Sequence, residues 1–370
     1  MDPIIFDTSD GQELRINMIS PFLKKHFGRK IVKLSLDGGF TCPNRDGSKG
    51  TGGCLFCSES GSGDMASSTI DTAGSTVDTP GSTVNTAGNT SPAGSADWSV
   101  RVSDITSALD RQIRLLSDKW PDAGYIAYFQ SHTNTYADVD YLRQLFYGAL
   151  EHPEVVGIAI ATRSDCISDD VLELLHELNQ KTFLWVELGL QTIHDETAKA
   201  MNLCHTLADY DDAVARLTEC GIRVVTHLIL GLPGEDRQMM LDSVRYVCGH
   251  INNGISNGLC PAEAEPNISD SSSPQHVFGI KLHMLNVVKG SGMETAYPGY
   301  IPFDTMDDYI DILIDCIENI PPDITVHRIS GDAPRSILIA PEWSYRKRTI
   351  LNEIHRQMRL RNTWQGRALD

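Results

Sequence analysis

Short apolar segments alternate with longer amphipathic segments along most of the chain, and this alternation constrains the fold more than any other feature. Apolar runs of strand length predict β-strands over residues 31–36, 125–129, 155–161, 183–188, 222–230, 278–288 and 324–329. Apolar residues at helical spacing predict helices over residues 104–120, 140–152, 171–179, 207–220, 237–251 and 307–320. Such alternation is typical of parallel strands joined by crossover helices. It predicts an α/β fold, an open or partial β/α barrel of six or seven units with its site at the C-terminal ends of the strands.

Two low-complexity stretches interrupt the pattern because they lack core-forming side chains. Residues 65–97 contain three similar seven-residue units rich in Ser, Thr and Gly, and residues 252–274 are rich in Asn, Ser, Asp, Glu, Gly and Pro. One aliphatic residue per unit gives no coiled-coil seam, so we expect both stretches to be disordered insertions. The remaining residues suffice for one domain. We expect a core over residues 25–330, with an N-terminal extension over 1–24 and a C-terminal extension over 331–370.

The net charge of −18 argues against nonspecific nucleic-acid binding by the whole surface. Residues 328–370 are nevertheless basic, with nine Lys and Arg against four Asp and Glu. This tail could hold a phosphate-bearing substrate, or it could simply be a solvated helix carrying Arg356, Arg359 and Arg361. The longest apolar run is far shorter than the roughly 20 residues that span a membrane, and the acidic start MDPIIFD is unlike a signal peptide. We therefore expect a cytoplasmic protein that does not enter a membrane.

Three cysteines lie close together in a glycine-rich loop after the first predicted strand. Cys54 and Cys57 form a Cys-x-x-Cys pair, and Cys42 precedes that pair in the same loop. Nine cysteines are an odd number, so a disulfide framework is not expected, and the six scattered cysteines are interpreted as small buried residues.

Thiolates in this arrangement suit zinc or an iron–sulfur cluster. A structural zinc site needs four ligands, and the fourth would have to come from outside the loop, for example from His132, His227 or Cys166. Three thiolates on a four-iron cluster would instead leave one iron open to a small molecule. Both alternatives are open at this point.

The loop motifs GFTCPNRDG and GGCLFC resemble the cluster loop of radical S-adenosylmethionine (SAM) enzymes, specifically the YhcC-like branch. The resemblance continues through GLQT, HLILGLPGE, KLHMLNVVKG, HRISGDAP, LIAPEW and WQG, and it covers roughly residues 12–366 apart from the insertions. The elongator catalytic subunit is a more distant relative. The resemblance implies a partial (β/α)6 TIM-like radical SAM barrel.

The resemblance also implies chemistry. Cys42, Cys54 and Cys57 would hold a 4Fe-4S cluster, and reductive cleavage of S-adenosyl-L-methionine would give a 5′-deoxyadenosyl radical that abstracts hydrogen from an unknown substrate. An electron donor such as flavodoxin or ferredoxin would be a partner. No second cysteine cluster is visible, so an auxiliary cluster is not expected.

Five further residues are assigned to SAM by the resemblance. Phe56 would lie near the adenine, Glu187 would accept hydrogen bonds from the ribose hydroxyls, and Gln191 could assist it. Arg163 is assigned to the SAM carboxylate or to substrate, and Gly231 lies in a loop that could approach the adenine. The structural alternatives are a loop anchor for Phe56, a salt bridge from Glu187 to Arg163, and a tight turn at Gly231.

Six polar residues are weaker candidates for the cavity: His132, Asn134, Tyr136, Lys281, His283 and Lys289.

The chain departs from the family pattern at residues 202–205, which read Asn-Leu-Cys-His where relatives usually read Asn-Arg-Gly-His. Without an arginine at Leu203, either Arg163 or another group replaces it, or SAM binds weakly, or activity is lost.

Two other functions compete with a radical SAM enzyme of unknown substrate. One is a non-catalytic barrel, stabilised by a metal or a cluster, that binds RNA or another partner through its basic tail. The other is a radical SAM enzyme acting on transfer RNA, as the elongator branch does; the basic tail is its only support in the sequence.

Overall fold

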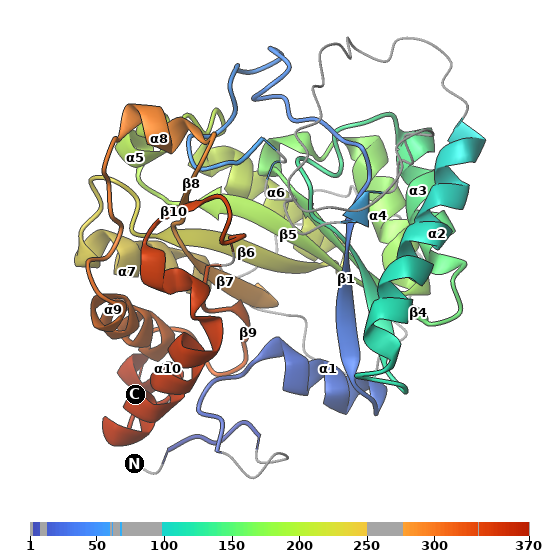
Figure 1. The fold of residues 1–370 in the computed structure, drawn as a ribbon. Helices are drawn as coiled ribbons and strands as arrows, with labels where there is room; N and C mark the ends of the chain where they lie inside the picture. The colour runs from blue at the N-terminus through green and yellow to red at the C-terminus, as the bar shows by residue number, and fades with distance from the viewer. Residues whose placement is uncertain are drawn as a thin grey trace.

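The computed structural model describes residues 3–7, 13–59, 61, 67–68, 98–249, 277–331 and 333–369. Its main sheet is parallel and curls into a half-barrel (Figure 1). In spatial order its strands are β2 (Ser67–Ser68), β1 (Ile31–Asp37), β3 (Gly124–Phe129), β4 (Val155–Thr162), β5 (Phe183–Gln191), β6 (Arg223–Leu230), β7 (Gly279–Met284) and β9 (Thr325–Arg328). The predicted partial barrel of parallel strands is therefore confirmed.

Crossover helices cover the outer face of the sheet, as the alternating pattern predicts. They are α2 (Trp98–Ser117), α3 (Val139–Leu150), α4 (Asp169–Lys181), α6 (Leu207–Glu219), α7 (Arg237–Cys248) and α9 (Met306–Glu318). Capping boxes of Thr206 with Asp209 and of Thr305 with Asp308 begin α6 and α9, because their side chains satisfy backbone groups that the first helical turn leaves unpaired. The largest apolar core of the molecule fills the space between these helices and the strands.

The terminal segments pack onto this barrel. Helix α1 (Ile19–Phe27) contributes Ile19 and Leu23 to a second apolar cluster with Trp185, inside the curl of the sheet. The backbone N–H of Val326 in β9 donates to the carbonyl of Asn17 at 2.7 Å, so the chain before α1 lies beside the last strand. At the other terminus, α10 (Lys347–Leu360) buries apolar side chains in the main core.

One predicted element is wrong. Residues 278–288 form two strands, β7 and β8 (Val287–Val288), where one was predicted, and β8 pairs in antiparallel fashion with β10 (Leu338–Ala340) in a separate sheet. The chain turns at Leu285 and Asn286, where Leu285 donates its backbone N–H to Leu230. An apolar run has the same composition before and after such a turn, so composition alone does not reveal it.

The remaining short elements are the helices α5 (Asp195–Ala200) and α8 (Gly292–Ala296) and the 3₁₀ helices η1 (Ser164–Cys166), η2 (Glu342–Tyr345) and η3 (Arg367–Leu369). Apart from Ser67 and Ser68, which pair with β1, the predicted insertions at 65–97 and 252–274 lie outside the described residues. Among the helices of the described segments, none combines the length and apolar character that crossing a membrane requires.

Candidate functional site

A cavity of about 220 Å³ opens at the C-terminal ends of the strands, where the barrel pattern predicts a site. The cysteine loop, the strand interiors and the strand ends all contribute side chains to it. The residues that line it include Cys42, Arg45, Cys54, Phe56, Cys57, Tyr128, His132, Arg163, Glu187, Gln191, His205, His227, Lys281, His283, Asn286 and Arg328.

The structure brings the three loop cysteines to this one cavity. Cys42, Cys54 and Cys57 are each partly exposed and line this cavity, and Asn44 Nδ2 lies 3.5 Å from Cys54 Sγ. Across the described residues, no three His, Cys, Asp or Glu side chains converge as the ligands of a single metal ion do. A four-iron cluster does not require such convergence, because each thiolate ligates a different iron. The donor set therefore fits a cluster.

The cysteine loop is held in place by the segment after α5. Leu55 donates its backbone N–H to Met201 at 3.0 Å, and Asn202 Nδ2 donates to the carbonyl of Gly53 at 2.8 Å. In return, Asn44 Nδ2 donates to the carbonyl of Asn202. Since these bonds join residues about 150 positions apart, the cysteine loop takes its conformation from the barrel as well as from its own glycines.

Leu203 and Cys204 occupy the positions where the family pattern has Arg and Gly. Leu203 is buried among apolar side chains. Cys204 has a φ of 55°, in the left-handed region that glycine adopts most readily. The family pattern therefore has glycine at a position whose backbone conformation favours glycine, and this chain adopts the same conformation with Cys204.

Arg163, at the end of β4, is committed to an ion pair. Its Nε and Nη2 donate to the two carboxylate oxygens of Asp165 at 2.9 and 2.8 Å, and the same guanidinium donates to the carbonyls of Leu203 and Cys204 at 2.9 and 3.1 Å. Burial opposes the carboxylate, but Arg163 and Lys49 lower the pKa of Asp165 to about 2. Asp165 in turn keeps the pKa of Arg163 above its ordinary value despite burial.

Glu187 is buried in a different network, so its predicted salt-bridge alternative with Arg163 is not what forms. Its carboxylate accepts hydrogen bonds from Lys281 Nζ, from Tyr128 Oη at 2.6 Å and from Trp185 Nε1 at 3.0 Å, and Lys33 Nζ lies 3.9 Å away. Burial opposes ionisation, but Lys281 and Lys33 hold the pKa of Glu187 well below its ordinary value. Glu187 is therefore the charged centre of this buried group.

Within the part of the chain that the structure describes, several polar atoms of cavity-lining residues are buried without a hydrogen-bond partner. They include Gln191 Oε1, His132 Nδ1, His205 Nδ1, His227 Nε2 and both side-chain polar atoms of Asn286. Buried polar groups are normally satisfied. These unsatisfied groups therefore fit a cavity that takes a polar ligand.

The remaining predicted residues divide between the cavity and its surroundings. Phe56 lines the cavity and also packs in the apolar cluster beneath the loop, so both interpretations of it agree with its position. Gly231 does not line the cavity and packs against Pro302 and Phe303, with a φ of 83°. Of the weaker candidates, Asn134 donates to the carbonyl of Ala161 at 2.8 Å.

The sequence did not point to Tyr128, His205, Asn286 and Arg328, which line the cavity, or to Lys33, which lies beside Glu187. Lys33, Tyr128 and Glu187 alternate with apolar residues on three strands, so a period-two reading could have found them. Tyr136 and Lys289, which the sequence did single out, do not line the cavity; Tyr136 Oη shares a 2.8 Å hydrogen bond with Ser48.

Two family models match the chain. The Radical SAM superfamily model matches residues 46–247 and so includes Cys54 and Cys57 but begins after Cys42. The Radical_SAM C-terminal domain model matches residues 277–359. Together they span both sides of the second insertion.

Relatives match over nearly the whole chain. Uncharacterized protein YtqA of Bacillus subtilis is 39% identical over 356 residues, 96% of this chain and 93% of that protein. Protein YhcC of Escherichia coli (strain K12) is 33% identical over 356 residues, 96% of this chain and 95% of that protein. The predicted resemblance to the YhcC-like branch is thereby confirmed.

A solved structure shows the same fold. Archaeal Elp3 from Methanocaldococcus infernus aligns with a TM-score of 0.54 and 16% identity, covering 71% of this chain and 60% of that chain. The chain thus spans less than two thirds of the Elp3 chain, and the likeness concerns the fold.

Proposed function

The chain belongs to the radical SAM superfamily, and on that premise we propose that it is a radical SAM enzyme whose 4Fe-4S cluster is held by Cys42, Cys54 and Cys57. The observation that carries the proposal is that all three thiols line one cavity together with unsatisfied polar groups of the strand ends, such as Gln191 Oε1. When bound, the cluster and SAM supply a 5′-deoxyadenosyl radical that abstracts hydrogen from substrate.

The chain's own residues fix the cysteine loop and leave room for a further ligand. The Asn202 side chain donates to the carbonyl of Gly53, and the carbonyl of Met201 accepts from the backbone N–H of Leu55. A loop held in this way keeps the three thiols at fixed separations. Because the loop contains no fourth cysteine or histidine, one iron of the cluster would be left without a ligand from the loop and open to the amino and carboxylate groups of SAM.

The assignment of SAM contacts is also a proposal. Gln191, at the end of β5, has an unsatisfied carbonyl oxygen that can accept from the ribose hydroxyls. Glu187 already accepts three hydrogen bonds, so its contact with the ribose would share those oxygens. Arg163 would hold the SAM carboxylate through the N–H that Asp165 and the two carbonyls leave available. Phe56, which lines the cavity, would contact the adenine. Gly231 does not line the cavity, so any effect it has on the adenine would be indirect.

Water exclusion follows from the apolar side chains around the loop. Leu203, Ile229 and Leu285 are buried and line the cavity beside the cysteines. Desolvation strengthens electrostatic contacts and protects reactive species from side reactions. An external reductant of the flavodoxin or ferredoxin class would supply the electron.

Anaerobic reconstitution tests the proposal. We expect about four irons and four sulfides per chain and release of 5′-deoxyadenosine that depends on dithionite. Cys54→Ala should lose iron and turnover with the fold retained, whereas Cys204→Ala, altered next to the same loop, should keep both. Stoichiometric zinc with no SAM cleavage would contradict the proposal and favour the non-catalytic barrel.

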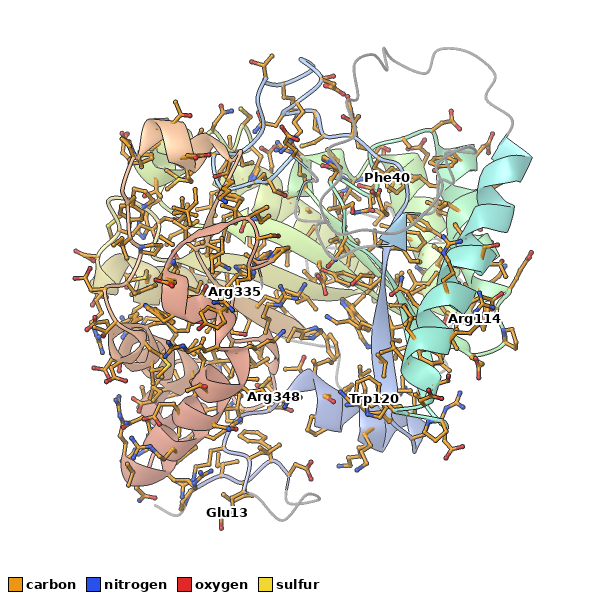
Figure 2. The ribbon with its side chains drawn as sticks, in the orientation of Figure 1. Glu13, Phe40, Arg114, Trp120, Arg335 and Arg348 are labelled. Carbon is orange, nitrogen blue, oxygen red and sulfur yellow. The ribbon has the colours of Figure 1, made fainter. Side chains whose placement is uncertain are left out.

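RNA is a second candidate as substrate or partner, favoured by the basic surface of the C-terminal segment. Arg346, Arg348 and Arg359 are exposed, and Figure 2 shows Arg348 on α10. Arg356 and Arg361 are paired with Glu353 and Asp311, which lowers the net charge of this surface. Binding that weakens steeply with salt and is lost in an Arg348→Gln, Arg359→Gln variant would support RNA; salt-independent binding would exclude it.

A further inference from the structure

Three cationic side chains gather in the interior of the half-barrel around one carboxylate. Lys33 comes from β1, Lys281 from β7 and Arg328 from the end of β9, so the group joins the two edges of the curled sheet. Glu187 is the only acidic side chain among the described residues that line the cavity. One carboxylate therefore lies among three basic side chains, of which Lys281 and Arg328 line the cavity.

The three cations differ in how closely they approach the Glu187 carboxylate. Lys281 Nζ forms a hydrogen-bonded ion pair with Glu187 and also donates to Tyr128 Oη at 2.8 Å. Lys33 Nζ is 3.9 Å from Glu187 and lies over the Tyr128 ring, 4.7 Å from its centre. Within the described part of the chain, the Arg328 guanidinium has no hydrogen-bond acceptor or acidic partner, although it lines the cavity. Arg328 is thus a cation available to a ligand.

The cations are close to one another, because Lys281 and Arg328 are paired residues of β7 and β9, and Lys33 Nζ lies 3.9 Å from the carboxylate that binds Lys281. Burial lowers the pKa of Lys281 to about 7; Glu187 opposes this shift, and Lys33 and Arg328 add to it. The pKa of Lys33 is lowered chiefly by burial, again against Glu187 and with a contribution from Arg328. A bound anion would relieve the repulsion among these cations. The concentration of positive charge is specific to the cavity, since the chain as a whole carries −18.

The cations near the cysteines, by contrast, already have partners. Arg163 is paired with Asp165, and Arg45 donates to the carbonyls of Ser58 and Glu59. Lys33 lies four residues before the end of β1, and at about 3.3 Å per residue this places it about 13 Å from the end of that strand. Lys33 is therefore deeper in the barrel than the cysteine loop, and Arg328 is in register with Lys281 on the neighbouring strand.

We propose that Lys33, Lys281 and Arg328 form a subsite for an anionic group of the substrate, a carboxylate or a phosphate, distinct from the place of the SAM carboxylate. Arg328 would bind the anion directly, since a planar guanidinium matches two oxygens of either group. Lys281 adds charge from the neighbouring strand β7 and Lys33 from β1 on the far side of the curled sheet, and Glu187 is a positioning residue that holds Lys281. The inference rests on the proposed function in one respect, namely that the anion belongs to the substrate of the radical reaction.

Calorimetric titration of the full chain with inorganic phosphate and, separately, with acetate tests the subsite at constant ionic strength. We expect saturable binding of at least one anion, and the preferred one identifies phosphate or carboxylate as the substrate group. Arg328→Gln should weaken that binding at least about tenfold, the loss of one charge-assisted hydrogen bond. Arg114→Gln removes the same charge from the exposed face of α2 (Figure 2) and should leave it unchanged within about twofold.

Lys33→Gln provides a second variant should Arg328→Gln fail to fold, and it should also weaken binding. No saturable binding, equal losses in Arg328→Gln and Arg114→Gln, or displacement of the anion by an equivalent of SAM would each overturn the proposal. SAM cleavage by the reconstituted wild-type protein is measured separately. If SAM is not cleaved, the proposed radical SAM activity is contradicted, whereas a measured anion site would still stand. The two failures are therefore distinguishable.

Discussion

Arg163 and Asp165, two residues apart at the end of β4, form a two-bond ion pair whose guanidinium also binds the carbonyls of Leu203 and Cys204. This pair connects the strand end to the segment that holds the cysteine loop. The family pattern has an arginine at the position of Leu203. Here Arg163 reaches the same segment from another strand, but it contacts the backbone and is already neutralised by Asp165.

Asp165→Asn should destabilise the protein and loosen the cysteine loop. The folded-state pKa of Asp165 is lowered to about 2, so its contribution is fully present above the unfolded value near 3.9 and is lost as the pH falls toward 2. With allowance for screening, we expect a loss on the order of 1–2 kcal/mol at pH 7. Urea unfolding at pH 7 and at pH 3 measures it.

Asp170→Asn is the matched control, because Asp170 lies on the exposed first turn of α4 and bonds only to local groups. Its effect at pH 7 should be smaller than that of Asp165→Asn. If Asp165→Asn shows the same pH dependence of stability as wild type, the ion pair with Arg163 does not stabilise the fold.

Cys204→Gly should leave stability unchanged or raise it. Cysteine at a φ of 55° is strained, and glycine adopts this conformation without a steric penalty. Relief of strain, partly offset by the greater freedom of glycine in the unfolded chain, predicts a gain of about 0.5–1 kcal/mol. Thermal unfolding compares Cys204→Gly with Cys204→Ala, which removes the thiol but keeps a Cβ. Equal melting temperatures would show that the backbone at residue 204 is not strained.

The sequence was sufficient for the fold because strand and helix periodicities depend on local alternation, and seven segments could be assigned as strands without tertiary information. It also located the three cysteines. The partners of Glu187 could not be predicted, because Lys281 and Tyr128 lie on other strands and their pairing depends on sheet curvature. Arg163, by contrast, pairs with Asp165, only two residues away. Arg328 was missed because a cation at a strand end has no local pattern, and its importance appears only when β9 curls toward β1.

Lys281 and Glu187 should show strong energetic coupling. Removing Lys281 leaves the buried carboxylate of Glu187 with only the more distant Lys33 as a cationic neighbour, so Lys281→Gln should cost about 3 kcal/mol. Replacing both, Glu187→Gln with Lys281→Gln, should cost less than the sum of the single changes, because no buried charge is left alone in this pair. Urea unfolding of the four proteins closes a double-mutant cycle. Additive effects would mean that the two side chains do not stabilise one another.

Gly231→Ala should destabilise the turn between β6 and α7 through both backbone strain and steric overlap. The φ of Gly231 is 83°, and an added Cβ would lie 2.7 Å from Phe303 Cε2 and 3.0 Å from Pro302 Cβ. Gly234 is a matched control in the same turn, because its φ of 87° is similar but an added Cβ would meet nothing within 4 Å. We expect about 1 kcal/mol of destabilisation for Gly234→Ala and about 2–4 kcal/mol for Gly231→Ala, the difference reporting the contact with Phe303. Equal losses in urea unfolding would show that Phe303 moves aside and that only the backbone conformation requires glycine. A Gly231→Ala protein of wild-type stability would mean that the turn adopts another conformation in solution.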